Sequence, residues 1–143
     1  MTITLTGLQH QVMRTLLIRA KNHAGLLALV PKDNIDPDGQ KAYPIITFTD
    51  PRALPVNRTC VRGADGSIDV HAFAGQTPTL TGRDHICAIG AQIETVFAPN
   101  EITLEDNSRC KLFFSDVRIL KDEAPDDWHW FGQLNIAVIK AFA

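Results

Sequence analysis

The chain has 143 residues, enough for one domain that buries roughly two-thirds of the surface its unfolded form exposes, so its fold does not depend on a metal or on disulfides. With 45% hydrophobic and 21% charged residues, its composition is that of a globular protein, which excludes a disordered or fibrous chain. Its 14 basic and 16 acidic side chains give a formal charge of −2, and this balance argues against a dedicated DNA-binding protein, which needs a positive field to hold the phosphate backbone.

The N-terminal segment predicts a helix over residues 6–23, because apolar side chains recur at steps of three and four residues. These side chains are Leu5, Leu8, Val12, Leu16 and Ala20. Thr6 is the expected N-cap, with Gln9 at the capping-box position three residues later. Gly25 is expected to supply a left-handed helix end, and residues 26–30 then predict one further turn.

The next part of the chain predicts two strands separated by a difficult segment. Residues 43–49 follow a turn region rich in Asp, Pro and Gly and have the composition of a strand. Pro51 and Pro55 then interrupt the pattern, and residues 64–66 (Ala-Asp-Gly) are expected to form a turn. Residues 67–74 alternate between apolar and polar side chains, which predicts a half-buried second strand.

The second half of the chain repeats this order. Residues 83–97 predict a helix with the apolar stripe Ile86, Ile89, Ile93 and Phe97. Strands are expected at residues 102–105, 110–120 and 128–142. The order α-β-β-α-β-β predicts a single α+β domain over residues 1–143, with both helices packed on one face of a mostly antiparallel sheet.

The cysteines predict neither a disulfide framework nor a zinc knuckle, because Cys60, Cys87 and Cys110 are odd in number and widely spaced. Buried free thiols in a reducing cytoplasm are the expected state. The N-terminus has no signal-peptide pattern, and the longest apolar run, residues 25–30, is far shorter than the ~20 residues of a membrane-spanning helix. The sequence therefore predicts a protein made in the cytoplasm without a membrane segment.

Enzyme signatures are absent from the sequence, including those of serine hydrolases, zinc proteases, P-loop proteins and dinucleotide-binding proteins. Two pairs could carry chemistry: His71 with Asp69 on one strand face, and Cys87 with His85 at a helix start. A surface polar pair is the favoured interpretation of the first, and a small buried hydrophobe that of Cys87. No catalytic residue, metal site or cofactor is predicted.

A segment of positive charge is the first of two features that stand out. Residues 51–64 contain Arg52, Arg58 and Arg62 and no acidic residue. A solvated loop with uneven charge and a docking loop both fit this pattern.

A cluster of aromatic residues is the second feature. Trp128, Trp130 and Phe131 lie within four consecutive positions, with His129 between them. If Trp128 and Trp130 lie on a strand and face the core of the domain, the alternation of side chains makes Phe131 point outward. An outward aromatic side chain is a typical anchor of assembly interfaces, whereas a helix covering both faces would bury it.

The layout as a whole resembles the small tail-terminator, or tail-completion, proteins of tailed bacteriophages and related phage-like particles. The segments that carry this resemblance are Leu26–Val30 (LLALV), Tyr43–Thr47 (YPIIT), Ile68–Gly75 (IDVHAFAG), the helix RDHICAIGAQIETVF, Val117–Glu123 (VRILKDE) and the long final aromatic strand. The resemblance implies a virion protein, made in the host cytoplasm, that forms a ring, commonly a hexamer. Such a ring caps the finished tail tube, ends tail polymerisation and joins the head, without catalytic residues or a cofactor. The implied partners are its own copies, the tail tube protein and the neck or connector proteins, with DNA only as cargo passing through.

The opposite charges of two segments give a hypothesis about contacts. Asp122, Asp126 and Asp127 lie in an acidic loop. The negative charge of this loop would complement the positive charge of the arginine segment, either between neighbouring subunits or between the ring and the tail tube. Two alternatives stay open: a neck or head-closure adaptor, and a small cytosolic enzyme that uses a Cys/His pair.

Overall fold

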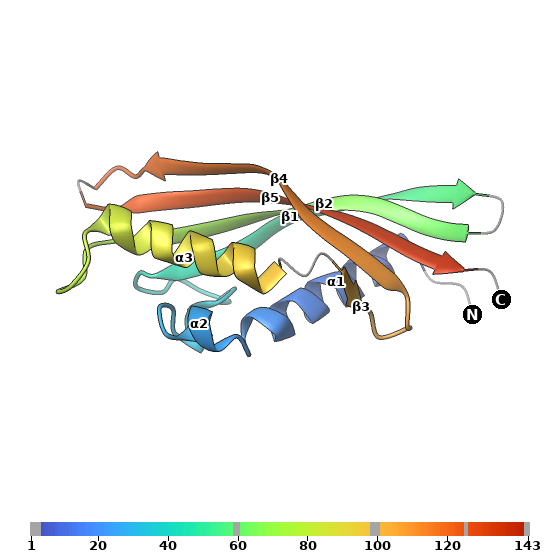
Figure 1. Ribbon diagram of the computed structural model, residues 1–143, viewed down its shortest axis with the longest axis horizontal. Coiled ribbons are helices and arrows are strands. Elements are labelled where there is room, and N and C mark those ends of the chain that lie inside the picture. Colours follow the sequence, from blue (N-terminus) through green and yellow to red (C-terminus); the bar gives the residue numbers. More distant parts are fainter. Residues whose placement is uncertain (1–3, 59–60, 98–100, 125, 142–143) are drawn as a thin grey trace.

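The computed structural model describes residues 4–58, 61–97, 101–124 and 126–141 (Figure 1). Its elements are, in chain order, α1 (Leu5–Ala20), α2 (Ala24–Leu27), the short 3-10 helix η1 (Lys32–Asn34), β1 (Ile45–Arg58), β2 (Val61–Ala74), α3 (Gly82–Phe97), β3 (Glu101–Thr103), β4 (Arg109–Lys121) and β5 (Trp128–Ala141). Within the described ranges, none of the helices has the length and hydrophobicity of a membrane-spanning segment.

The five strands form one sheet in the order β1-β2-β5-β4-β3, and every neighbouring pair is antiparallel. The final strand β5 returns along the whole length of β2, from the pair Ala74–Trp128 to the pair Val61–Ala141. All the described helices lie on one side of the sheet, so the other side is an open face (Figure 1). This arrangement confirms the predicted α+β class, with the helices on one face of an antiparallel sheet.

The core lies between the sheet and the apolar stripes of α1 and α3. The stripe residues that are buried are Leu8, Val12, Leu16 and Ala20 on α1 and Ile86, Ile89 and Ile93 on α3. They pack against alternate residues of the central strands, including Ile68, Val70 and Leu134. Burying each large aliphatic side chain contributes about 1.5–3 kcal/mol, so this layer supplies most of the driving force for folding.

The first helix begins and ends earlier than predicted. Its N-cap is Thr4, whose Oγ1 accepts a hydrogen bond from the backbone N–H of Gly7 (2.9 Å), so the expected cap at Thr6 is wrong. The helix ends at Ala20, and the His23 side chain then caps α2 by accepting from the N–H of Leu26 (3.2 Å). Because this second cap restarts a helix, Gly25 is helical, and its expected left-handed role is also wrong.

The region around the prolines is a continuous hairpin. β1 runs through Pro51 and Pro55, with a shift of register between Thr49 and Arg52. Proline is tolerated there because β1 is an edge strand, in which the N–H groups on the side away from β2 take no part in the hydrogen-bond ladder. The turn predicted at residues 64–66 is wrong: these residues lie within β2 and pair with β1 on one side and β5 on the other.

Candidate functional site

The arginine segment lies on a projecting hairpin. We call residues 50–58 of β1 and 61–66 of β2 the hairpin arm. Arg52 lies opposite Ser67, and Arg62 lies opposite Lys140 of β5. The arm also contains Asp50 and Asp65, so its three arginines leave it a formal charge of +1. The Arg52 side chain is exposed, and its Nη2 is 3.5 Å from Oδ2 of Asp69. The predicted loop is thus a pair of strands, and Arg58 and Arg62 stand near its tip.

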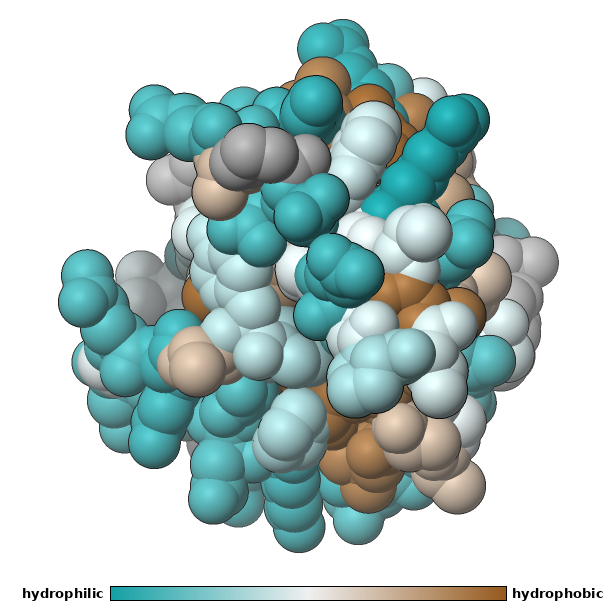
Figure 2. Space-filling view, turned by 90° about the vertical axis from the view of Figure 1, so that its left-hand side faces the viewer, coloured by the Kyte–Doolittle hydropathy of each residue, from teal (hydrophilic) through white to brown (hydrophobic). Residues whose placement is uncertain are grey.

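The acidic loop, residues 122–127, lies at the opposite end of the long axis from the hairpin arm (Figure 1). The Asp122 backbone N–H donates to the carbonyl oxygen of Asp127 (2.9 Å), and Tyr43 Oη donates to Asp122 Oδ2 (3.1 Å). Asp126 is exposed, and Asp122 and Asp127 are half-buried. Figure 2 faces this end and shows hydrophilic side chains over most of it, with hydrophobic patches between them. The two charged segments are therefore too far apart to neutralise each other within one chain.

The aromatic segment is divided between the two faces of the sheet. Trp130 is only 2% exposed and packs edge-on against Phe114, with ring centroids 5.7 Å apart. Trp128 is half-buried against the same core. Phe131 lies on the open face, as alternation predicts, at 5.2 Å from the His71 ring. Of the three, Phe131 is thus the side chain best placed to meet a partner.

Four other rings join Phe131 on or beside the open face and form an aromatic cluster that sequence reasoning missed. Its other members are Tyr43, His71, Phe73 and His129, with neighbouring centroids between 4.3 and 6.4 Å apart. The His71 Nδ1 and His129 Nε2 atoms are 2.8 Å apart, and Thr49 Oγ1 lies 3.2 Å from His71 Nε2. His71 and His129 are far apart in sequence, and the register between β2 and β5 brings them together.

This histidine pair predicts a loss of stability in mild acid. Burial lowers the pKa of His129, and the neighbouring His71 lowers it further, although Asp122 acts in the opposite direction. Because the unfolded chain has a histidine pKa of about 6.5, it takes up the proton first, so the free energy of unfolding falls as the pH drops below that value. We expect urea unfolding at pH 7.5 and pH 5.5 to show this fall, and His129→Gln to reduce it. An unchanged pH dependence in His129→Gln would contradict the role of this pair.

The two members of the Cys/His pair lie in different environments. The His85 ring is buried and its Nδ1 donates to the carbonyl oxygen of Gly75 (2.9 Å). Cys87 is exposed, so its prediction as a buried hydrophobe is wrong: one helical position beyond Ile86, its side chain leaves the buried stripe. Cys110 is buried as expected, and Cys60 lies outside the described residues. In the described ranges no three His, Cys, Asp or Glu side chains are grouped to hold a metal.

The two described thiols should differ sharply in reactivity. Burial raises the pKa of Cys110 to about 12, so its nucleophilic thiolate is scarce at neutral pH. We expect iodoacetamide to modify Cys87 in the folded protein and to leave Cys110 unmodified until the chain unfolds, as measured by peptide mass spectrometry. Modification of both at equal rates in the native protein would show that the core around β4 is open.

A domain with oppositely charged ends and an aromatic open face has the surface of a protein that assembles with other proteins. The family model described as tail completion protein gp17 matches residues 14–139, so the chain belongs to this family. It is a structural protein of the tail and neck region of a phage-like virion, and the resemblance drawn from the sequence is confirmed.

A solved structure shares the fold. A chain of the structure titled "Virion of native gene transfer agent (GTA) particle" superposes with a TM-score of 0.73 and 17% sequence identity. The match covers 97% of the present chain and 100% of that chain, so the two share their whole architecture. Among proteins with curated descriptions, none matches this sequence.

Proposed function

We propose that this protein forms a ring that caps the completed tail tube, ends tail polymerisation and offers the surface to which the head is joined. The family match over residues 14–139 carries the proposal. The ring is a hexamer of this chain, in contact with the tail tube protein on one side and neck or connector proteins on the other. DNA passes through it as cargo without sequence-specific contacts, which agrees with a formal charge of −2.

The separation of charge along the molecule supports a closed ring. A ring needs a heterologous interface, in which one patch meets a different patch on the next subunit. The hairpin arm and the acidic loop form such a pair, because the arm carries three arginines and the loop four carboxylates. The two segments lie at opposite ends of the chain's long axis (Figure 1). Complementary charges of this kind speed encounter and disfavour wrong pairings.

Charge reversal tests this contact. In the Arg58→Glu/Arg62→Glu variant the arm and the acidic loop repel each other, and we expect ring formation and tail completion to fall by at least about 10-fold. Adding Asp126→Arg/Asp127→Arg restores attraction and should recover part of this loss. Native mass spectrometry measures the ring, and electron microscopy of the particles measures tail completion.

A matched control changes the same charge elsewhere. Lys32→Glu/Lys41→Glu alters two exposed lysines outside both segments and should assemble normally. Arginine variants that form rings and complete tails as well as this control would refute the charge contact. Particles without the protein should have tails of unregulated length, whereas tails of normal length that fail to join heads would identify a neck adaptor instead.

A further inference from the structure

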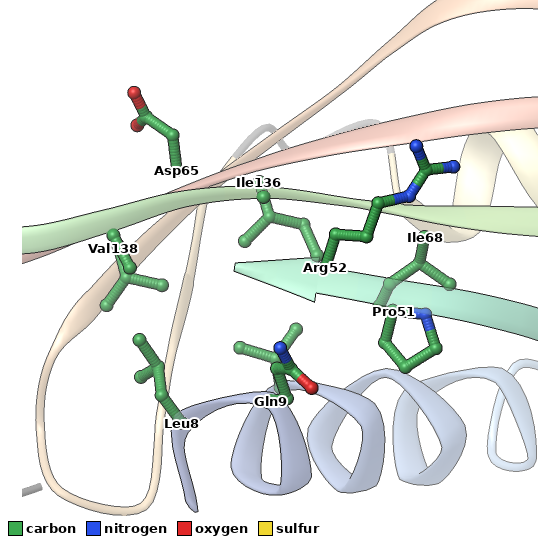
Figure 3. Close-up of a pocket in the computed structure, with 11 residues that line it drawn as sticks. Leu8, Gln9, Pro51, Arg52, Asp65, Ile68, Ile136 and Val138 are labelled. Carbon is green, nitrogen blue, oxygen red and sulfur yellow. The ribbon is translucent and has the colours of Figure 1, made fainter. Parts of the chain in front are cut away.

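A shallow groove, open to solvent, lies between α1 and the hairpin arm (Figure 3). Leu8 of α1 and Ile68, Ile136 and Val138 of the strands line it, and Figure 3 shows the Asp65 carboxylate directed away from it. The groove is open to solvent, too small to enclose a cofactor, and lined mainly by apolar side chains, so the surface it offers suits an aliphatic side chain laid across it.

The end of β4 has the complementary character. β3 pairs with β4 only from Arg109 to Lys111, and in the described chain no other strand pairs with this edge of β4 further along. Val117, Ile119 and Leu120 are 39%, 45% and 45% exposed. An apolar edge strand exposed to solvent favours association with another protein surface. We therefore expect these side chains to be covered by a partner in the assembled particle.

We infer that the apolar end of β4 of one subunit docks in the α1–arm groove of the next subunit through Val117 and Ile119, which share one face of the strand. The inference rests on the proposed ring and names the contact that closes it. In Figure 1, β4 ends at one extreme of the long axis, whereas the hairpin arm and the start of α1, which line the groove, lie towards the other. The β4 end therefore cannot reach the groove of its own chain, and a second copy is the occupant that joins two such distinct patches head to tail.

The charges around both surfaces agree with this pairing. The acidic loop begins directly after the end of β4, at Asp122, so it would reach the rim of the neighbour's groove. Arg52 lines that groove, and its side chain is 60% exposed. A guanidinium has five N–H donors and can bind two carboxylates, so Arg52 can contact Asp69 of its own chain and a carboxylate of the neighbour's loop. The apolar and the charged contacts thus belong to one continuous interface.

Disulfide trapping in assembled particles tests the inference. In a Cys60→Ser/Cys87→Ser background, Gln9→Cys on the groove wall and Ile119→Cys on β4 should form a bond between subunits under mild oxidation. The expected result is a ladder of covalent multimers on a denaturing gel, ending at the size of the ring. The matched control pairs Ile119→Cys with Ile18→Cys, which is equally on α1 but 53% exposed away from the groove, and should give no ladder.

A polar substitution provides an independent measurement. Ile119→Asp places a charge in the groove and should reduce tail completion by about 10-fold or more, whereas Ile18→Asp should leave it unchanged. Because both positions are exposed, both variants should keep the circular dichroism spectrum and melting temperature of the parent. Two results would overturn the inference and leave the proposed function standing. One is a ring of normal mass in which the cysteine pair gives no ladder, and the other is normal assembly of the Ile119→Asp variant. Completed tails with no ring of this protein would overturn both.

Discussion

Truncating Trp130 to alanine is expected to lower the free energy of unfolding by about 3–5 kcal/mol, a large part of the roughly 5–15 kcal/mol that stabilises a domain. The indole is 2% exposed and lies edge-on to Phe114. It also packs so closely on α3 that a side chain at Gly90 would overlap it. Its removal leaves a cavity at the meeting point of α3, β4 and β5, which the surrounding elements can fill only partly. Urea unfolding followed by circular dichroism measures the change.

The neighbouring residue provides the control. Phe131→Ala removes a ring from the open face, where it makes an aromatic contact with His71 at 5.2 Å, so we expect a cost of about 1 kcal/mol. If Phe131 also meets a partner, this variant should fold and yet assemble poorly. A Trp130→Ala variant no less stable than Phe131→Ala would show that the indole is not part of the core.

The helices were the part of the fold that sequence patterns predicted best. The helix expected over residues 83–97 is observed as Gly82–Phe97, because three isoleucines at steps of three and four residues can be buried together only on a helix. The N-terminal helix was found, but its ends were displaced. Thr4 and Thr6 are equally suited to the cap by residue type, so the sequence pattern alone does not distinguish them, and in the structure Thr4 is the cap.

The hairpin arm shows why local signals failed in the middle of the chain. Ala64, Asp65 and Gly66 have turn-forming character, yet Gly66 pairs with Ala53 on one side and Ile136 on the other. Pairing on both edges outweighs local propensity, and β5, which supplies one of these edges, lies some seventy positions later, roughly half a chain away in sequence. No pattern within the segment reveals that strand.

The sequence predicted which charged residues belong to the candidate site, but not where they lie in the fold. The opposite charges of the arginine segment and the acidic loop can be read from composition, but their positions at the two ends of the molecule depend on how the long strands pair. The same holds for the contact between His71 and His129 and for the groove beside α1, since both join residues from separate elements. Those surfaces therefore become visible only once the strand register is known.

The backbone of the acidic loop lies directly against Gly82, the first residue of α3. A Cβ atom there would overlap the carbonyl oxygen of Asp126 and lie 2.9 Å from Cδ1 of Trp128. Because the obstructing atom belongs to the backbone, a substitution cannot be relieved by moving a flexible side chain. The loop itself must shift, and with it the carboxylates that the proposed ring contact uses.

Gly82→Ala is therefore expected to lower the free energy of unfolding by about 1–3 kcal/mol and to weaken ring formation beyond what this loss explains. Gly39→Ala is the matched control: a Cβ there meets no atom within 4 Å, so it should be neutral or slightly stabilising. Urea unfolding and native mass spectrometry on both variants separate the two effects, because a stability loss alone can be offset by lowering the temperature. A Gly82→Ala protein that is less stable than Gly39→Ala but regains full ring formation at low temperature would show that the loop position serves folding only. Persistent loss of the ring in a fully folded protein would tie assembly to the geometry that this glycine permits.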